Sequence, residues 1–255
     1  MKYLEALHRL KIFHKKDVVV LTKDTNAAKE ILRRYKKQEL ISQVRRDLYV
    51  ATDLANKASL ATKFEIAGQI THSSCLAYHS ALEYHGLAHQ VFYELYVSSK
   101  EIFNHFNYEG ISYRFCPSKS DIGVVNPATD LLVRVTDLER TMLDCIDRID
   151  LSGGIEELVE CFAIITYVDE NKLLDYLNHF NKQVLYQKAG FTLGYFQKEM
   201  KLSDDFFEQC KSKTGKSIRH LTYMSESDTY FKEWKLYAPK NILSFLEQGW
   251  EGVMV

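Results

Sequence analysis

Residues 25–52 have the sequence TNAAKEILRRYKKQELISQVRRDLYVAT, which combines a two-faced helix with a short hairpin. Thr25 is a good N-cap, and the spacing of the apolar residues predicts a helix from Asn26 to about Lys37. Its packing face consists of Ala27, Ala28, Ile31, Leu32 and Tyr35. Its opposite face consists of Asn26, Lys29, Arg33, Lys36 and Lys37, with Glu30 and Arg34 at the edge. Two β-prone runs, Leu40–Val44 and Leu48–Thr52, then flank Arg45-Arg46-Asp47 and predict a hairpin with a doubly basic tip.

The segment before residue 25 supplies the rest of a small helical unit. Tyr3, Leu4, Leu7 and Leu10 form one apolar stripe, which predicts a first helix. The run Val18–Leu21 is short and rich in β-branched residues, so it fits either a strand or a buried helix. Three helices followed by a basic hairpin are the layout of a winged helix-turn-helix.

This layout suits double-stranded DNA. A helix is narrow enough to enter the major groove, where its cations and Asn26 can meet phosphates and base edges. Wing arginines can reach a backbone or the minor groove alongside. The predicted DNA-contacting residues are Thr25, Asn26, Lys29, Arg33, Arg34, Lys36, Lys37, Arg45 and Arg46. The alternative is a solvated basic helix with no ligand, which is what most charge runs are.

The uneven distribution of charge favours the DNA-binding interpretation. Residues 1–57 carry 14 Lys and Arg against 7 Asp and Glu, whereas residues 58–255 carry 19 against 27. A basic head on an acidic body is typical of a nucleic-acid-binding module joined to a part that does not touch nucleic acid. We therefore predict a DNA-binding domain over 1–57 and a second domain over 58–255, with a possible subdivision near 168–182.

Composition places the chain among ordinary globular proteins. It has 255 residues, 46% hydrophobic and 26% charged, with only 3 Pro and 11 Gly. The N-terminal segment is charged and amphipathic and lacks a signal-peptide core, and no stretch is long and apolar enough to span a membrane. We expect a cytoplasmic protein with no membrane partner. Five scattered cysteines without a CxxC pair predict reduced, mostly buried thiols.

The body alternates between predicted helices and strands, so the fold class is α+β: an N-terminal winged helix-turn-helix, then a mixed α/β body with a helical C-terminal part. The predicted helices cover Ser59 or Thr62 to Ile70, Ser73–Tyr84, Asp137–Arg148, a segment opened by Gly153-Gly154 and running to about Thr166, and most of the chain from Asp169 to Lys213. The predicted strands cover Gln90–Ser98, Ile111–Cys116, Leu131–Val135, Ile218–Tyr223 and Lys232–Tyr237.

Several strings in the body resemble a known family. Residues 80–87, SALEYHGL, are similar to a "SALExHGL" segment of the AbiEi family, the antitoxins of type IV toxin–antitoxin systems. Residues 137–144, DLERTMLD, resemble the "xxERTLLD" helix of that family, and Ser152–Ile155 resemble the Gly-Gly segment that follows it. Ala189-Gly190-Phe191 and Leu193-Gly194 resemble a weaker C-terminal motif. The matching positions to which we assign a structural or antitoxin role are Ser80, Glu83, His85, Gly86, Glu139, Arg140, Thr141, Asp144, Gly153 and Gly154.

The resemblance implies an antitoxin that represses its own operon and takes part in phage defence by abortive infection. It further implies a nucleotidyltransferase toxin as functional partner, opposed by the C-terminal domain without a stable complex. The head departs from common winged helices, because Gln38 and Asp47 stand where Gly is frequent. Asp tolerates a left-handed turn at modest cost, so the predicted wing is retained.

Each motif also has a purely structural interpretation. Glu139, Arg140 and Asp144 fit fold-holding ion pairs or caps better than catalysts. The pairs Cys75/His79 and His79/Glu83 have i,i+4 metal-ligand spacing, but two ligands on one helix are weak evidence, so we predict no metal and no cofactor. No phosphate-binding or nucleophile motif is present, so we do not expect an enzyme.

Two other functions stay open. One is a stand-alone winged-helix regulator whose body senses a small ligand or a protein. The other is an enzyme that acts on nucleic acid or on the toxin, for which the sequence offers only scattered titratable residues.

Overall fold

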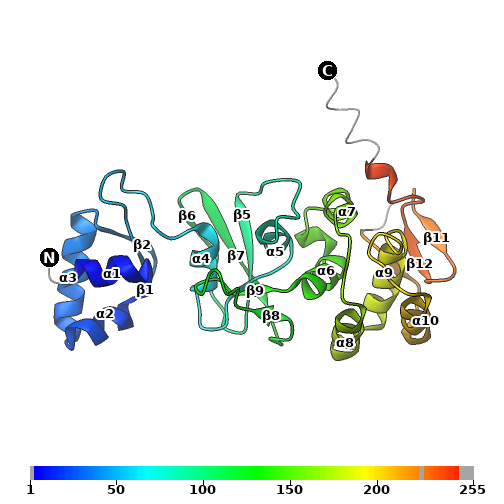
Figure 1. Ribbon diagram of the computed structural model, residues 1–255, viewed down its shortest axis with the longest axis horizontal. Helices are drawn as coiled ribbons and strands as arrows, with labels where there is room; N and C mark the ends of the chain where they lie inside the picture. The colour runs from blue at the N-terminus through cyan, green and yellow to red at the C-terminus, as the bar shows by residue number, and fades with distance from the viewer. Residues whose placement is uncertain (1–2, 224–226, 247–255) are drawn as a thin grey trace, which may run out of the picture. The chain divides into compact units, whose positions relative to one another are not determined.

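A computed structural model describes residues 3–223 and 227–246, and it has an α+β fold (Figure 1). The chain divides into two compact units. Unit 1 consists of Met1–Leu76, Tyr93–Lys119 and Asn126–Arg134, and unit 2 of Ala77–Phe92, Ser120–Val125 and Val135–Val255. The predicted domain boundaries, 1–57 and 58–255, stay predictions. The first residues of one predicted domain and the last residues of the other lie outside the described part of the chain. The predicted subdivision near 168–182 falls inside unit 2.

The first part of unit 1 is a winged helix-turn-helix. Its elements, in chain order, are α1 (Leu4–Leu10), β1 (Ile12–His14), α2 (Lys15–Thr22), α3 (Thr25–Lys37), β2 (Ile41–Arg45) and β3 (Leu48–Ala51). The three strands form a sheet of order β1-β3-β2, so the hairpin of β2 and β3 is the wing and β1 flanks it. Leu7, Phe13, Val18 and Tyr35 are buried in one hydrophobic cluster that joins the helices to the sheet.

The structure resolves or corrects three details of this head. Val18–Leu21 is helical, because a capping box between His14 and Asp17 starts α2 just before it. Thr25 is the first residue of α3 and Asp24 is its N-cap, so the prediction that Thr25 caps the helix is wrong. Strand β1 is absent from the sequence prediction, since a three-residue strand gives no measurable periodicity.

The rest of unit 1 is a small mixed sheet with one short helix. Its elements are α4 (Lys63–Gly68), β4 (Cys75–Leu76), β5 (Glu94–Ser99), β6 (Phe106–Tyr108) and β7 (Ile111–Pro117). The strands lie in the order β6, β7, β5, β4, with β5 parallel to β7 and the other neighbours antiparallel. Gly68, the last residue of α4, lies against the backbone of residues 132–134. A Cβ at this position would lie 2.5 Å from the carbonyl oxygen of Leu132, so only glycine fits.

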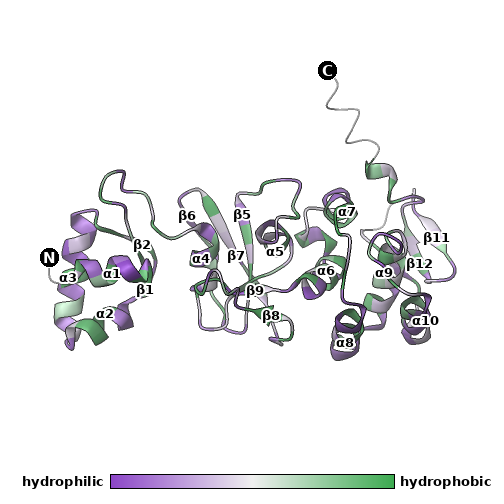
Figure 2. Cartoon of the chain, in the orientation of Figure 1, coloured by the Kyte–Doolittle hydropathy of each residue, from purple (hydrophilic) through white to green (hydrophobic). Residues whose placement is uncertain are grey.

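Unit 2 is mostly helical. It begins with α5 (His79–Tyr84), β8 (Val124–Val125), β9 (Val135–Thr136), α6 (Leu138–Asp147), a 3-10 turn (Ile149–Leu151) and α7 (Ile155–Ala163). It continues with α8 (Glu170–Phe180), α9 (Gln183–Gly194), α10 (Asp204–Lys213), β10 (Arg219–His220), β11 (Thr229–Phe231) and β12 (Leu236–Ala238). The last three strands form a sheet of order β10-β12-β11. Figure 2 shows apolar residues along one side of helices such as α6, and these residues make up a large buried cluster.

Two body predictions differ from the structure. The helix predicted over Ser73–Tyr84 is wrong in its first half, where β4 forms and the chain turns before α5. Of the strand predicted over Leu131–Val135, only Val135 lies in a strand.

All five cysteines are buried, as predicted. Within the described residues, no helix has the length and apolar character needed to cross a membrane.

Gly190 in α9 gives a direct test of the packing in unit 2. A Cβ at this position would lie 2.1 Å from the ring of Trp234, which is buried. We expect Gly190→Ala to lower the free energy of unfolding by about 1–3 kcal/mol in a denaturant titration, because the ring must move. Gly194→Ala, at the end of the same helix, meets only an ordinary contact at 3.8 Å and is the matched control. Equal stability of the two variants would contradict this packing.

Candidate nucleic-acid interface

Helix α3 is held by its buried face and by a defined start. Ala28, Ile31, Leu32 and Tyr35 are buried in the cluster of the head. The Asp24 carboxylate accepts hydrogen bonds from the amides of Asn26 and Ala27, at 2.6 and 3.0 Å, and these bonds lower the Asp24 pKa. Thr22 closes the α2–α3 turn, because its hydroxyl donates to the carbonyl of Asp24 at 2.8 Å. The buried face and the capped N-terminus fix the orientation of α3 within the head, so its outer face points to solvent.

The outer face of α3 carries an exposed row of cations, which we call the α3 ridge: Lys29, Arg33, Arg34, Lys36 and Lys37. Thr25 and Asn26 are also exposed, at the start of the helix. Arg33 pairs with Glu30 of the same helix at 2.5 Å, but the Arg33 side chain is 72% exposed. Lys36 donates to the side-chain oxygen of Gln43 at 2.9 Å. Such exposed pairs are weak, so a phosphate can replace the acidic or amide partner.

A depression of about 230 Å³ extends the ridge toward the wing strands. It is lined by Lys15, Lys29, Leu32, Arg33, Lys36, Asp47 and Tyr49. Lys15, the first residue of α2, therefore belongs to the same basic surface, although the sequence prediction omitted it. The sequence feature that could have identified Lys15 is the pair Lys15-Lys16, which comes immediately before Asp17 of the capping box.

The two wing arginines have different surroundings. Asp47 takes the left-handed turn expected of it, with φ of 63°. Arg46 is 94% exposed at the tip. The Arg45 guanidinium instead lies 5.5 and 5.4 Å from the ring centres of Phe103 and Phe106, and burial lowers its pKa. The structure thus gathers the α3 residues on one exposed face, whereas Arg45 stacks within unit 1.

The residues of the 137–144 string form a buried framework in unit 2. Arg140 donates to both oxygens of Asp144 at 2.8–2.9 Å and to the carbonyl of Ile122 at 2.7 Å. Burial raises the pKa of Asp144 to about 6, although Arg140 opposes this shift. Glu139 accepts a hydrogen bond from the amide of Asp169 at 2.9 Å. The Thr141 hydroxyl donates to the carbonyl of Thr136 at 3.0 Å. These contacts support the structural interpretation of the string.

The other residues of the family-like strings also have local structural contacts. Ser80 is fully buried in α5, and Glu83 is partly buried in the same helix. His85 bonds through Nε2 to the carbonyl oxygen of Thr136 at 2.7 Å. Gly86, Gly153 and Gly154 have φ of 72°, 91° and 98°, a region that favours glycine, and Gly154 precedes α7 as its N-cap.

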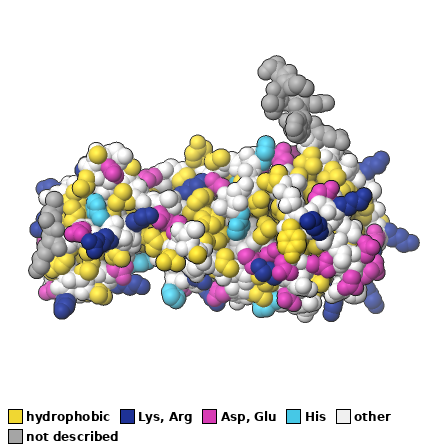
Figure 3. Space-filling model, in the orientation of Figure 1, with side chains coloured by type: hydrophobic (Ala, Val, Ile, Leu, Met, Phe, Trp, Pro, Cys, Tyr) yellow, Lys and Arg dark blue, Asp and Glu magenta, His cyan; other side chains and the backbone are white. Residues whose placement is uncertain are grey.

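Acidic side chains gather elsewhere on the molecule. Residues 137–175 hold 11 acids against 3 bases. On the face shown in Figure 3, Asp and Glu side chains lie over helices α8 and α10. An acidic surface repels a polyanion, so unit 2 is a poor candidate for the nucleic-acid contact.

Comparisons with known proteins give a likeness of fold only. No family model matches the chain, and no curated protein matches it. Among solved structures, the chain is similar to the crystal structure of the RV2827C protein from Mycobacterium tuberculosis, with a TM-score of 0.61. The two chains are 14% identical, and the similarity covers 97% of this chain and 93% of the other. At this identity the likeness supports a shared fold over nearly the whole chain and says nothing of function.

Proposed function

We propose that this protein is a DNA-binding antitoxin that represses its own operon. In this proposal, the α3 ridge enters the major groove of promoter DNA while Arg46 reaches the neighbouring backbone. The observation that carries the proposal is the ridge itself: five cations on one exposed helix face of a winged helix-turn-helix. Neutralising phosphates with exposed cations releases counterions and supplies most of the affinity of such modules.

The antitoxin part rests on the resemblance of the body strings to the AbiEi family. It assigns to the C-terminal body the opposition to a nucleotidyltransferase toxin, without a stable complex. The buried contacts of Arg140 and Glu139 are consistent with this assignment. They give these family-like residues a role in holding the fold, and that role requires no catalysis. The proposal includes no cofactor and no catalytic residue.

One observation favours a second candidate function, a regulator that senses a ligand. A pocket of about 780 Å³ lies in unit 1 beside the start of α2. It is lined by His14, Lys16, Asp17, Gly68, Gln69, Ile70, Thr71, His72, Ser73, Glu101, Asn126 and Arg134. Pockets of this size hold small molecules, and a ligand here would touch the helix that supports α3.

Co-expression with the neighbouring toxin gene tests the antitoxin proposal. We expect the full-length protein to restore growth to cells that express the adjacent nucleotidyltransferase. We also expect the variant Arg33→Ala/Lys36→Ala/Lys37→Ala to rescue growth equally well while losing repression of a promoter reporter, because the changes lie outside the body. If the protein represses the reporter but does not restore growth, the antitoxin proposal is wrong and the regulator proposal stands.

A further inference from the structure

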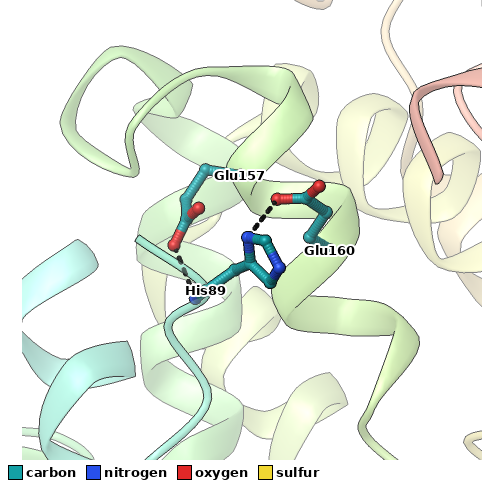
Figure 4. Close-up of side chains that lie close together, drawn as sticks. All are labelled: His89, Glu157 and Glu160. Atoms are coloured by element: carbon teal, nitrogen blue, oxygen red, sulfur yellow. Dashed lines mark hydrogen bonds and ion pairs between the residues drawn. The ribbon is translucent and has the colours of Figure 1, made fainter. Parts of the chain in front are cut away.

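A cluster of metal-ligand side chains lies in unit 2 and takes no part in the proposed DNA contact (Figure 4). Glu157 and Glu160 are three residues apart on α7, so their side chains leave the helix on the same side. His89 comes from the segment that follows α5. Each residue offers one ligand atom, and the three atoms lie within 4.8 Å of one another. Nδ1 of His89 lies 3.1 Å from Oε2 of Glu160.

Glu157 is the anchor of this cluster. Its side chain is fully buried, and its Oε1 accepts hydrogen bonds from Nε2 of His79 at 3.1 Å and from the amides of His89 and Gln90 at 2.9 and 3.1 Å. The two amide bonds fix the 89–90 segment against α7 and bring the His89 ring beside Glu160, as Figure 4 shows. Within the described part of the chain, Oε2 of Glu157 has no hydrogen-bond partner.

The second carboxylate oxygen of Glu157 is the atom left over for a metal ion. Its partner oxygen already accepts the bonds from His79, His89 and Gln90, whereas Oε2 is buried and accepts none among the described residues. A buried carboxylate oxygen without a partner is costly, and a bound cation would remove that cost.

We propose that His89, Glu157 and Glu160 bind a divalent transition-metal ion, and that Zn²⁺ fits them. One imidazole nitrogen and two carboxylates form a ligand set that Zn²⁺ accepts, and a fourth position stays open for water or another ligand. Tetrahedral ligands about 2.1 Å from the metal lie about 3.4 Å apart. The three ligand atoms, which lie within 4.8 Å of one another, would have to move only slightly closer to bind one ion. His89 can supply this movement, because its side chain is 68% exposed.

The hydrogen bonds to Oε1 of Glu157 act as outer-shell support for this site. Metal-bound carboxylates are themselves oriented by such bonds, and losing the bonds commonly costs 10–100-fold in metal affinity. The bound ion would join the segment after α5 to α7 by a second link besides the amide bonds. Its role is then to stabilise this part of unit 2.

Calorimetric titration of Zn²⁺ into metal-stripped full-length protein tests the proposal. We expect one Zn²⁺ per chain for the wild type. His89→Ala or Glu160→Gln removes a direct ligand, so we expect either to weaken binding by about 100-fold or more, beyond the loss of an outer hydrogen bond. Both side chains lie outside the core, so the variants should fold, which a circular dichroism spectrum checks. The thermal midpoint of the wild type should rise with Zn²⁺, and that of His89→Ala/Glu160→Gln should not.

Two control variants separate this site from adventitious binding. Glu156→Gln changes an exposed carboxylate on the same helix, and His105→Ala removes an exposed histidine of unit 1. Both should bind Zn²⁺ as the wild type does. Failure of the wild type to bind Zn²⁺, or equal binding by His89→Ala/Glu160→Gln, would overturn the proposal and leave the proposed function untouched.

Discussion

Replacing Arg33, Lys36 and Lys37 together with alanine is expected to lower the affinity for promoter DNA on the order of 100-fold at roughly 0.15 M salt. The three side chains are exposed on α3, so they are free to meet phosphates. Each lost phosphate contact removes about 0.9 from the slope of log K against log salt, and three contacts remove nearly three units. Fluorescence anisotropy of a labelled duplex measures both quantities.

The matched control removes the same charge from unit 2. Lys198→Ala/Lys216→Ala/Arg219→Ala also exchanges two lysines and one arginine, all of them exposed. We expect this variant to bind as the wild type does, because net charge alone does not position a phosphate. If both triple variants lose affinity to the same extent, the α3 ridge is not the contact surface.

Arg140→Met is expected to lower the free energy of unfolding by about 3–5 kcal/mol at pH 7. The side chains of Arg140 and Asp144 are only 8% and 13% exposed. Without the guanidinium, the Asp144 carboxylate is left buried and unpaired, and the carbonyl of Ile122 loses its donor. A cation 4.6 Å above the ring of Phe180 is lost as well.

The pH dependence separates this cause from a simple packing defect. Burial already raises the pKa of Asp144 to about 6 in the wild type, and loss of Arg140 raises it further. The native variant then binds a proton more tightly than the unfolded chain does, so its stability rises as the pH falls from 7 toward 5. The difference between Arg140→Met and the wild type should therefore shrink at pH 5. Arg140→Met/Asp144→Asn should recover part of the loss at pH 7, and a penalty unchanged by either treatment would contradict the account.

The sequence predicted the head well because its signals are local. The two faces of the 26–37 helix and the Arg45-Arg46-Asp47 tip follow from side-chain periodicity and turn chemistry. The structure shows both, except that Ala27, predicted on the packing face, is exposed. The run Val18–Leu21 was ambiguous, since propensity alone opposes a helix there. The capping box of His14 and Asp17 and the burial of Val18 decide it.

The rest of the site depends on contacts between distant segments, which periodicity does not reveal. The stacking of Arg45 on Phe103 and Phe106 joins residues about sixty positions apart, so no local pattern distinguishes Arg45 from Arg46. The cluster of His89, Glu157 and Glu160 is of the same kind. Sequence spacing instead drew attention to Cys75 and His79, of which Cys75 lies in a strand rather than on the helix that the spacing assumes. Short strands such as β1, β4 and β9 are likewise fixed by pairing and not by their own residues.

The salt dependence of binding between the wild-type protein and the duplex upstream of its own gene tests the central claim most directly. The α3 ridge with Arg46 offers six exposed cations, so we predict a slope of log K against log salt of about −5 between 50 and 200 mM salt. A slope near zero, or no binding at 50 mM salt, would show that this basic surface does not hold DNA.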